Sequence, residues 1–193
     1  LRAFAFSFFL VLGTFTVASF AAPVMSANNG WTERDLSRVY MAAGLCTLVT
    51  MNVIGRLADR LPRRPLFLVL AGAALVMAVV IANLGRMPLW GGALAFSLFM
   101  MFAAGRMVPA QAMLLGTAAP RVRGSFLSLN TFVQHAATGA APVIAGALVA
   151  KQPDGTLAGF PLVGAVAAGT AAVSLVLALF LRPAREDLAA TVP

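Results

Sequence analysis

The sequence predicts an all-α membrane protein with six transmembrane helices. Three observations lead to this prediction: hydrophobic residues make up 61% of the 193 residues, charged residues make up only 10%, and the charges are gathered between long uncharged stretches. A soluble domain keeps about 25% charged residues to cover its surface. Lipid is therefore the expected solvent of most of this chain.

The spans follow from the lengths of the uncharged stretches, because a helix needs about 20 mostly apolar residues to cross a bilayer. We predict one transmembrane domain over 1–183, followed by a polar cytoplasmic tail at 184–193. The first helix is expected to end near Pro23, and Thr32 is expected to cap the second. The predicted spans are 3–25, 36–56, 65–85, 89–117, 124–150 and 159–181.

The fourth span contains an arginine. If Arg106 ended this helix, the 14 uncharged residues that follow it would be too short to cross the membrane alone. We therefore predict one helix over 89–117 with Arg106 inside it. In the last span, Gly164 with Ala168 and Ala165 with Gly169 form small-residue pairs that predict close helix packing.

The basic residues predict the orientation. Six spans place nine arginines on the side of both chain ends and four basic residues on the other side. Because cytoplasmic loops carry an excess of arginine and lysine, both termini are expected in the cytoplasm. The net charge of +8 is thus a topology signal and not a sign of nucleic-acid binding. Abundant arginine with scarce lysine suggests a bacterium, so the bacterial cytoplasmic (inner) membrane is the expected location.

The densest group of charges lies between the second and third predicted spans. Its pattern is G-x-x-x-D-R-x-x-R-R, formed by Gly55, Asp59, Arg60, Arg63 and Arg64. This pattern resembles the cytoplasmic loop signature of the major facilitator superfamily, which occurs between the second and third helices of a six-helix half. In that family a glycine usually precedes the paired basic residues, and here Pro62 takes its place.

Two further segments are similar to the same family. The residues GRMVPAQAML at 105–114 and RGSFLSLN at 123–130 look like the fourth and fifth helices of bacterial efflux-type members of the drug- and sugar-efflux group, and GAAPVIAG at 139–146 resembles a fifth-helix glycine-proline motif. The resemblance implies half of a twelve-helix fold, with an inverted three-plus-three repeat. The start of the chain at Leu1 and its polar tail favour the C-terminal half, so the partner is expected to be an N-terminal six-helix half of the same chain.

The resemblance implies that the charged turn is a conformational latch. Such a turn braces the two halves in the outward-facing state and releases them in the inward-facing state. The simpler interpretation is that these arginines only hold the loop in the cytoplasm. Asp59 favours the latch, because acidic residues contribute little to topology.

Four residues are predicted to line a substrate pathway: Arg106, Asn130, Gln134 and His135. A charge inside the membrane is costly and usually faces a cavity or a partner. At about 1.5 Å per residue, Arg106 and His135 lie at a similar depth near mid-membrane. For Arg106 the alternative is a structural role, in which it binds carbonyls freed near Pro109 or snorkels toward the cytoplasm. For His135 the alternative is a histidine that only packs between helices.

These features predict a secondary transporter that moves a small molecule by alternating access, with efflux by proton antiport. No cofactor or metal site is expected, and we found no motif for enzyme catalysis. The expected partners are the substrate, the lipid bilayer and the other half. Two alternatives remain, a non-transporting membrane scaffold or sensor and a half-size transporter that pairs with itself.

Overall fold

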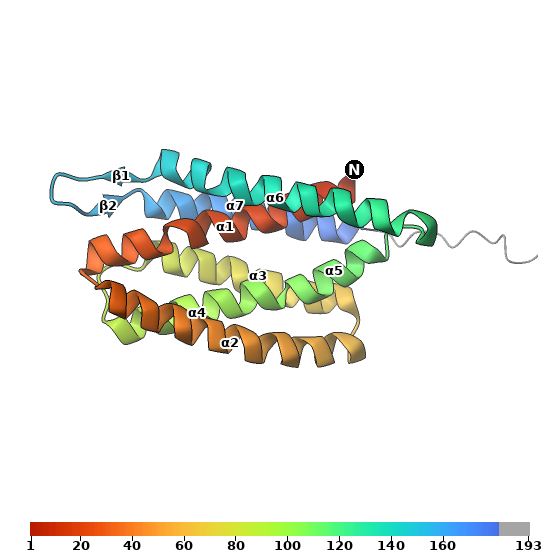
Figure 1. Ribbon diagram of the computed structural model, residues 1–193, viewed down its shortest axis with the longest axis horizontal. Coiled ribbons are helices and arrows are strands. Elements are labelled where there is room, and N and C mark those ends of the chain that lie inside the picture. Colours follow the sequence, from red (N-terminus) through yellow and green to blue (C-terminus); the bar gives the residue numbers. More distant parts are fainter. Residues whose placement is uncertain (182–193) are drawn as a thin grey trace, which may run out of the picture.

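The computed structural model describes residues 1–181, so the predicted tail at 184–193 lies outside the described residues. Its long helices lie side by side in one bundle (Figure 1). The helices are α1 (Arg2–Asn29), α2 (Glu33–Arg60), α3 (Arg63–Asn83), α4 (Leu89–Gly105), α5 (Met107–Leu115), α6 (Arg123–Leu148) and α7 (Phe160–Phe180), with a short 3₁₀ helix at Pro120–Val122. A hairpin of β1 (Ala150–Lys151) and β2 (Leu157–Ala158), which the all-α prediction did not include, joins α6 to α7.

The helices divide into two groups of three passes. The first helix α1 packs along α6 and α7, α2 packs along α4, and α3 packs along α4, α5 and α7. If α1, α2 and α3 are exchanged with α4–α5, α6 and α7, this set of contacts maps onto itself. Because α1 and α4 run in opposite directions (Figure 1), the exchange also inverts the chain direction. This is the arrangement expected of an inverted three-plus-three repeat.

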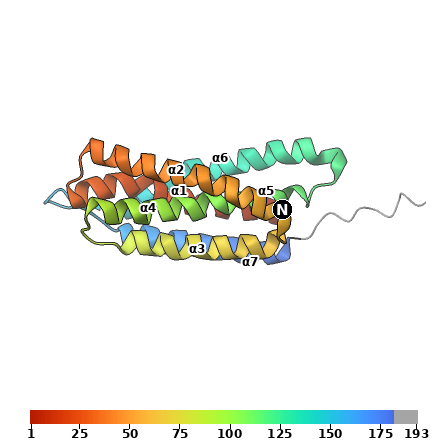
Figure 2. The ribbon, with the colours of Figure 1, turned by 90° about the horizontal axis from the view of Figure 1, so that it is seen from below.

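The two sides of the bundle differ. Seen from below, α2 and α6 lie along one edge and α3 and α7 along the opposite edge, with α1 and α4 between them (Figure 2). The edge formed by α3 and α7 is closed by direct contact between these two helices. The chain begins, and Leu181 follows α7, at the end of the bundle that also carries the α2–α3 turn (Figure 1). We call this the arginine-rich end, and the end with the hairpin the opposite end.

The first helix is longer than predicted, because it continues past Pro23 to Asn29. A proline inside a helix removes one backbone hydrogen bond but does not have to end the helix when neighbouring helices hold it. The helix ends instead at Gly30, whose φ of 67° is left-handed and whose N–H donates to the carbonyl of Ser26. Thr32 caps the next helix, as predicted, in a capping box with Asp35.

The predicted helix over 89–117 is one pass made of two helices, α4 and α5, that meet at Arg106. Pro109 has no N–H, so the carbonyl of Gly105 loses its helical partner. The backbone of Arg106 stays in the right-handed helical region, and the N–H of Ala110 still reaches its carbonyl at 3.2 Å. Leu89–Leu115 therefore crosses the bundle as a single interrupted rod.

Five segments of the described chain are long and apolar enough to span a membrane: Arg2–Asn29, Glu33–Arg60, Arg63–Asn83, Leu89–Leu115 and Phe160–Phe180. The sixth pass, α6, is 26 residues long and is not among these five. It carries several polar residues, including Asn130, Gln134 and His135. Because α6 packs along α1, it belongs to the bundle.

Small residues bring α3 and α7 together. Gly164 is buried, and a Cβ built on it would overlap the Cβ of Ala82 on α3. A Cβ on Gly169 would have no heavy atom within 4 Å. Of the two small-residue pairs, the one with Gly164 therefore supplies this close approach.

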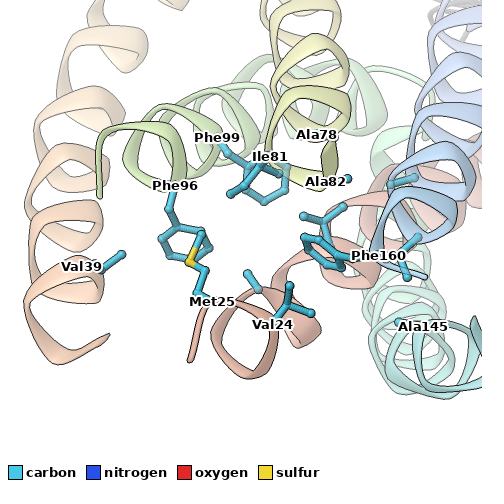
Figure 3. Packing of buried hydrophobic residues seen from close by; sticks show 14 of the residues in the cluster. Val24, Met25, Val39, Ala78, Ile81, Ala82, Phe96, Phe99, Ala145 and Phe160 are labelled. Atoms are coloured by element: carbon cyan, nitrogen blue, oxygen red, sulfur yellow. The ribbon is translucent and has the colours of Figure 1, made fainter. Parts of the chain in front are cut away.

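Larger side chains fill the interior near the opposite end (Figure 3). All six passes contribute to this cluster, which includes Val24 and Met25 of α1, Val39 of α2, Ala78, Ile81 and Ala82 of α3, Phe96 and Phe99 of α4, Ala145 of α6 and Phe160 of α7.

We expect Gly164→Ala to lower the stability of the full-length protein by about 1–3 kcal/mol, because the added methyl group would force α3 and α7 apart. Gly169→Ala is the matched control and should be neutral or slightly stabilising, since alanine has the higher helix propensity. Unfolding in mixed detergent micelles measures both. Equal effects of the two substitutions would contradict the close packing at Gly164.

Candidate functional site

Arg106 is enclosed within the bundle, with only 2% of its surface exposed. Its Nη2 atom donates to the carbonyl of Leu10 at 3.2 Å and to the hydroxyl oxygen of Thr14 at 2.6 Å. Both acceptors belong to α1. The arginine at the α4–α5 break is thus fastened to the middle of the first helix, and not to the carbonyl freed by Pro109.

No carboxylate of residues 1–181 neutralises this charge. The acidic residues of the described chain are Glu33, Asp35, Asp59 and Asp154, and all of them lie at helix ends or in loops. Within the same residues, the only ion pair joins Asp35 to Arg38, at 3.5 Å. Arg106 therefore holds its place through neutral acceptors alone.

A second polar contact joins α1 to α6. The hydroxyl of Ser7 donates to the Oδ1 atom of Asn130 at 2.5 Å, and both residues are buried. Ser7 and Thr14 are seven residues apart, so they lie on the same face of α1. Asn130 and Arg106 consequently approach one face of α1 from two different helices.

Gln134 lies one turn beyond Asn130 on α6. Since α1 and α6 run in the same direction (Figure 1), this turn carries Gln134 to the level of Leu10 and Val11. That is the stretch of α1 that Arg106 also reaches. Three of the four predicted pathway residues, Arg106, Asn130 and Gln134, are thus gathered around one segment of α1.

This segment holds buried donors without acceptors. The Nε and Nη1 atoms of Arg106 and the Nε2 atom of Gln134 are buried and have no hydrogen-bond partner among the described residues. Buried N–H groups are nearly always paired, so each exception needs an explanation.

His135 lies apart from this group. It is exposed, as are Ser128, Thr131, Gly139 and Pro142, which form one face of α6. The buried face of the same helix carries Asn130, Ala137, Ala141 and Ala145. His135 is therefore level with Gln134 along α6 but points to a different side of the helix. The four predicted pathway residues do not form one group, because three lie near α1 and His135 is exposed.

The charged turn at the arginine-rich end is tight. The α2 helix ends at Arg60, Leu61 and Pro62 form the connection, and α3 begins at Arg63. Asp59, Arg60 and Arg63 are exposed, while Gly55 is half-buried in α2. Asp59 makes no ion pair within residues 1–181. Its carboxylate is therefore available to a group outside the described part of the chain.

Arg64 has a different role from its neighbours in this turn. Its Nη2 atom donates to the carbonyl of Leu181, which follows the last residue of α7. A cation at a helix C-terminus is favoured by the helix dipole and by its unpaired carbonyls. Arg64 thus ties α3 to α7 at the arginine-rich end.

The sequence reasoning missed the polar contacts at the opposite end. The side-chain amide of Asn28 donates to the carbonyl of Leu157 at 2.9 Å and accepts from its N–H at 2.7 Å. The Oδ1 atom of Asn29 accepts from the N–H of Met87 at 2.8 Å. The consecutive asparagines could have signalled side-chain binding to the backbone, but the sequence does not reveal which loops they would bind.

Beside these asparagines is a concavity of about 320 Å³, which Arg86 and Asp154 also line. Hydrogen bonds from the hydroxyl and N–H of Thr156 lower the pKa of the Asp154 carboxyl. This end of the bundle is thus polar but separate from the buried group around Arg106.

We expect Arg64→Gln to destabilise the protein by about 0.3–1 kcal/mol, because the cation at the end of α7 is lost. Arg63→Gln is the matched control, since it removes the same charge at the neighbouring position, and within residues 1–181 Arg63 makes no hydrogen bond to the end of α7. Thermal unfolding of the two variants at low salt compares them. A larger loss in Arg63→Gln than in Arg64→Gln would contradict the assignment of this contact.

The comparisons with known proteins agree with the geometry. A family model described as the Major Facilitator Superfamily matches residues 4–192. No curated protein and no solved structure matches the chain. The match covers almost the entire sequence and agrees with the apolar helices, the inverted arrangement and the charged turn between the second and third passes. This multi-pass membrane protein belongs to the major facilitator superfamily.

Proposed function

We propose that this chain is the C-terminal half of a secondary active transporter that moves a small molecule by alternating access, as an efflux system driven by proton antiport. One observation carries the proposal: a buried arginine without a counter-charge among residues 1–181, where α4 meets α5 inside a predicted membrane span. Charges inside a membrane span are costly and are kept where a substrate or ion path needs them. Family membership supplies the general class of function.

A second six-helix unit is the proposed partner, namely an N-terminal half of the same chain. The exposed face of α6 carries Ser128, Thr131 and His135. Polar side chains on a lipid-facing surface are unfavourable, so this face suits a protein partner or a water-filled path better than hydrocarbon. The poorly buried α2 lies along the same edge (Figure 2).

Proton coupling requires a group that titrates near neutral pH or a carboxylate inside the membrane. Among residues 1–181 the membrane helices hold no deep carboxylate, and His135 is the only histidine. An imidazole nitrogen can accept and release a proton. We propose that His135, or an acidic residue of the partner half, accepts the proton, and that the arginine-rich end faces the cytoplasm of a bacterium.

The latch hypothesis is carried by Asp59. Its carboxylate is exposed and unpaired with residues 1–181, at the tight turn that begins α3. We propose that in the assembled transporter Asp59 binds a donor of the other half in one access state and loses it in the other.

We predict that Arg106→Ala abolishes transport by the full-length protein while membrane insertion stays normal, since the buried donors are removed. Arg86→Ala, at the exposed opposite end, is the control and should retain transport. Uptake into everted membrane vesicles, measured with a compound that the wild-type protein moves, tests this. Unchanged transport by Arg106→Ala would remove Arg106 from the pathway.

We predict that Asp59→Asn slows the exchange between the two access states about tenfold, which corresponds to about 1.4 kcal/mol in the barrier. Glu33→Gln removes an acidic charge at the opposite end of α2 and should leave the rate unchanged. Spin labels at the two ends of the assembled transporter would report the populations and the exchange. A normal rate in Asp59→Asn would reduce the turn to a topology signal.

A further inference from the structure

We propose that Arg106 and Gln134 form the binding site for an anionic group of the transported molecule, so that the substrate carries a carboxylate or a similar oxyanion. The inference rests on the proposed transport function and adds the chemical class of the substrate. It starts from the buried N–H groups that the chain leaves without acceptors.

The donors around this segment outnumber the acceptors. A guanidinium only donates hydrogen bonds, and the Nη2 atom of Arg106 already uses the carbonyl of Leu10 and the hydroxyl of Thr14. The other buried polar pair on this face of α1 offers no free acceptor, because the Oδ1 atom of Asn130 already accepts from the hydroxyl of Ser7. The Nε and Nη1 atoms of Arg106 and the Nε2 atom of Gln134 are left to bind something else.

A negatively charged acceptor suits these donors best. Arg106 brings a full positive charge into a space with 2% exposure, and residues 1–181 place no carboxylate inside the membrane helices. A buried cation is stable only when it is paired or well solvated by hydrogen bonds. An oxyanion supplies both the opposite charge and several acceptor oxygens, and charge-assisted bonds to it are stronger than bonds to a neutral amide.

The position suits a transported ligand. Arg106 reaches α1 between Leu10 and Thr14, near the middle of the helix Arg2–Asn29. Substrate sites of transporters built from inverted repeats commonly lie between the two repeats, and Arg106 bridges the two three-helix groups here.

The site is enclosed in this state. Met107 packs against the cluster of Val11, Leu12, Ala137 and Ala141 that joins α1 to α6. Because Arg106 is buried, a ligand can reach it only if neighbouring side chains move, and Met107 follows it directly in the chain. The flexible methionine side chain can rearrange at little cost.

Thermal unfolding of the purified full-length protein tests the inference with matched pairs of small molecules. Sodium acetate, benzoate, succinate and phosphate are the anionic probes, and acetamide and benzamide are neutral partners of the first two. A ligand that binds only the folded protein raises its unfolding midpoint with concentration. At least one anion should raise the midpoint of the wild-type protein, and the amides should not.

The variants locate the binding. The shift should disappear in Arg106→Met, require about tenfold more anion in Gln134→Leu, and persist in Arg86→Met. Equal shifts with acetate and acetamide, a shift that persists in Arg106→Met, or no shift with any anion would each overturn the proposal.

The unfolding temperature of Arg106→Met without ligand distinguishes a ligand-binding arginine from one with a purely structural role. If the Nε and Nη1 atoms of Arg106 have no acceptor in the ligand-free protein, Arg106→Met should unfold at the same or a higher temperature. The reason is that an apolar side chain replaces an uncompensated charge. A marked fall would mean that the bonds Arg106 already makes within the protein stabilise it on balance, as expected of a structural arginine, and would overturn the proposal. Transport of a neutral compound without anion binding would reject this inference alone, whereas anion binding at Arg106 without any transport would reject the proposed function.

Discussion

The burial of the Arg106 charge among the helices is the constraint around which the rest of the structure is arranged. A guanidinium in hydrocarbon must be enclosed by protein, and its Nη2 atom finds both acceptors on the first helix, at Leu10 and Thr14. These two bonds bridge the interrupted pass of α4 and α5 to α1 near the middle of that helix. The first passes of the two three-helix groups are thereby joined through polar atoms at the centre of the bundle.

The remaining helices pack against these two passes, with α2 and α3 along α4, and α6 and α7 along α1. On one edge, α3 and α7 close the bundle through Gly164 and Ala82 near one end and through Arg64 and Leu181 at the other. On the other edge, α2 and α6 stay exposed, and α6 presents His135 there. The two edges therefore differ, because one is closed by helix contact and the other exposes apolar side chains of α2 together with the polar residues of α6.

Much of this was predictable from residue patterns. The uncharged stretches located the passes, Thr32 with Asp35 indicated the start of α2, and the uncharged surroundings of Arg106 indicated a single pass through it. Other features depend on tertiary contacts that one sequence does not specify. Helix geometry shows that Gln134 and His135 point to different sides of α6, but it does not show which of them faces α1. Pro23 stays inside its helix because neighbouring passes hold it, and Arg64 differs from Arg63 only through a carbonyl more than a hundred residues away.

The contact between Arg106 and Thr14 can be measured directly with a double-mutant cycle. The free energy of unfolding of the full-length protein would be compared among the wild type, Thr14→Val, Arg106→Met and the double variant in mixed micelles. Residues in contact typically show a coupling of about 0.5–3 kcal/mol, whereas distant residues are additive. The structure predicts a coupling in this range, and additive effects would contradict the claim that Arg106 is fastened to α1 at the centre of the bundle.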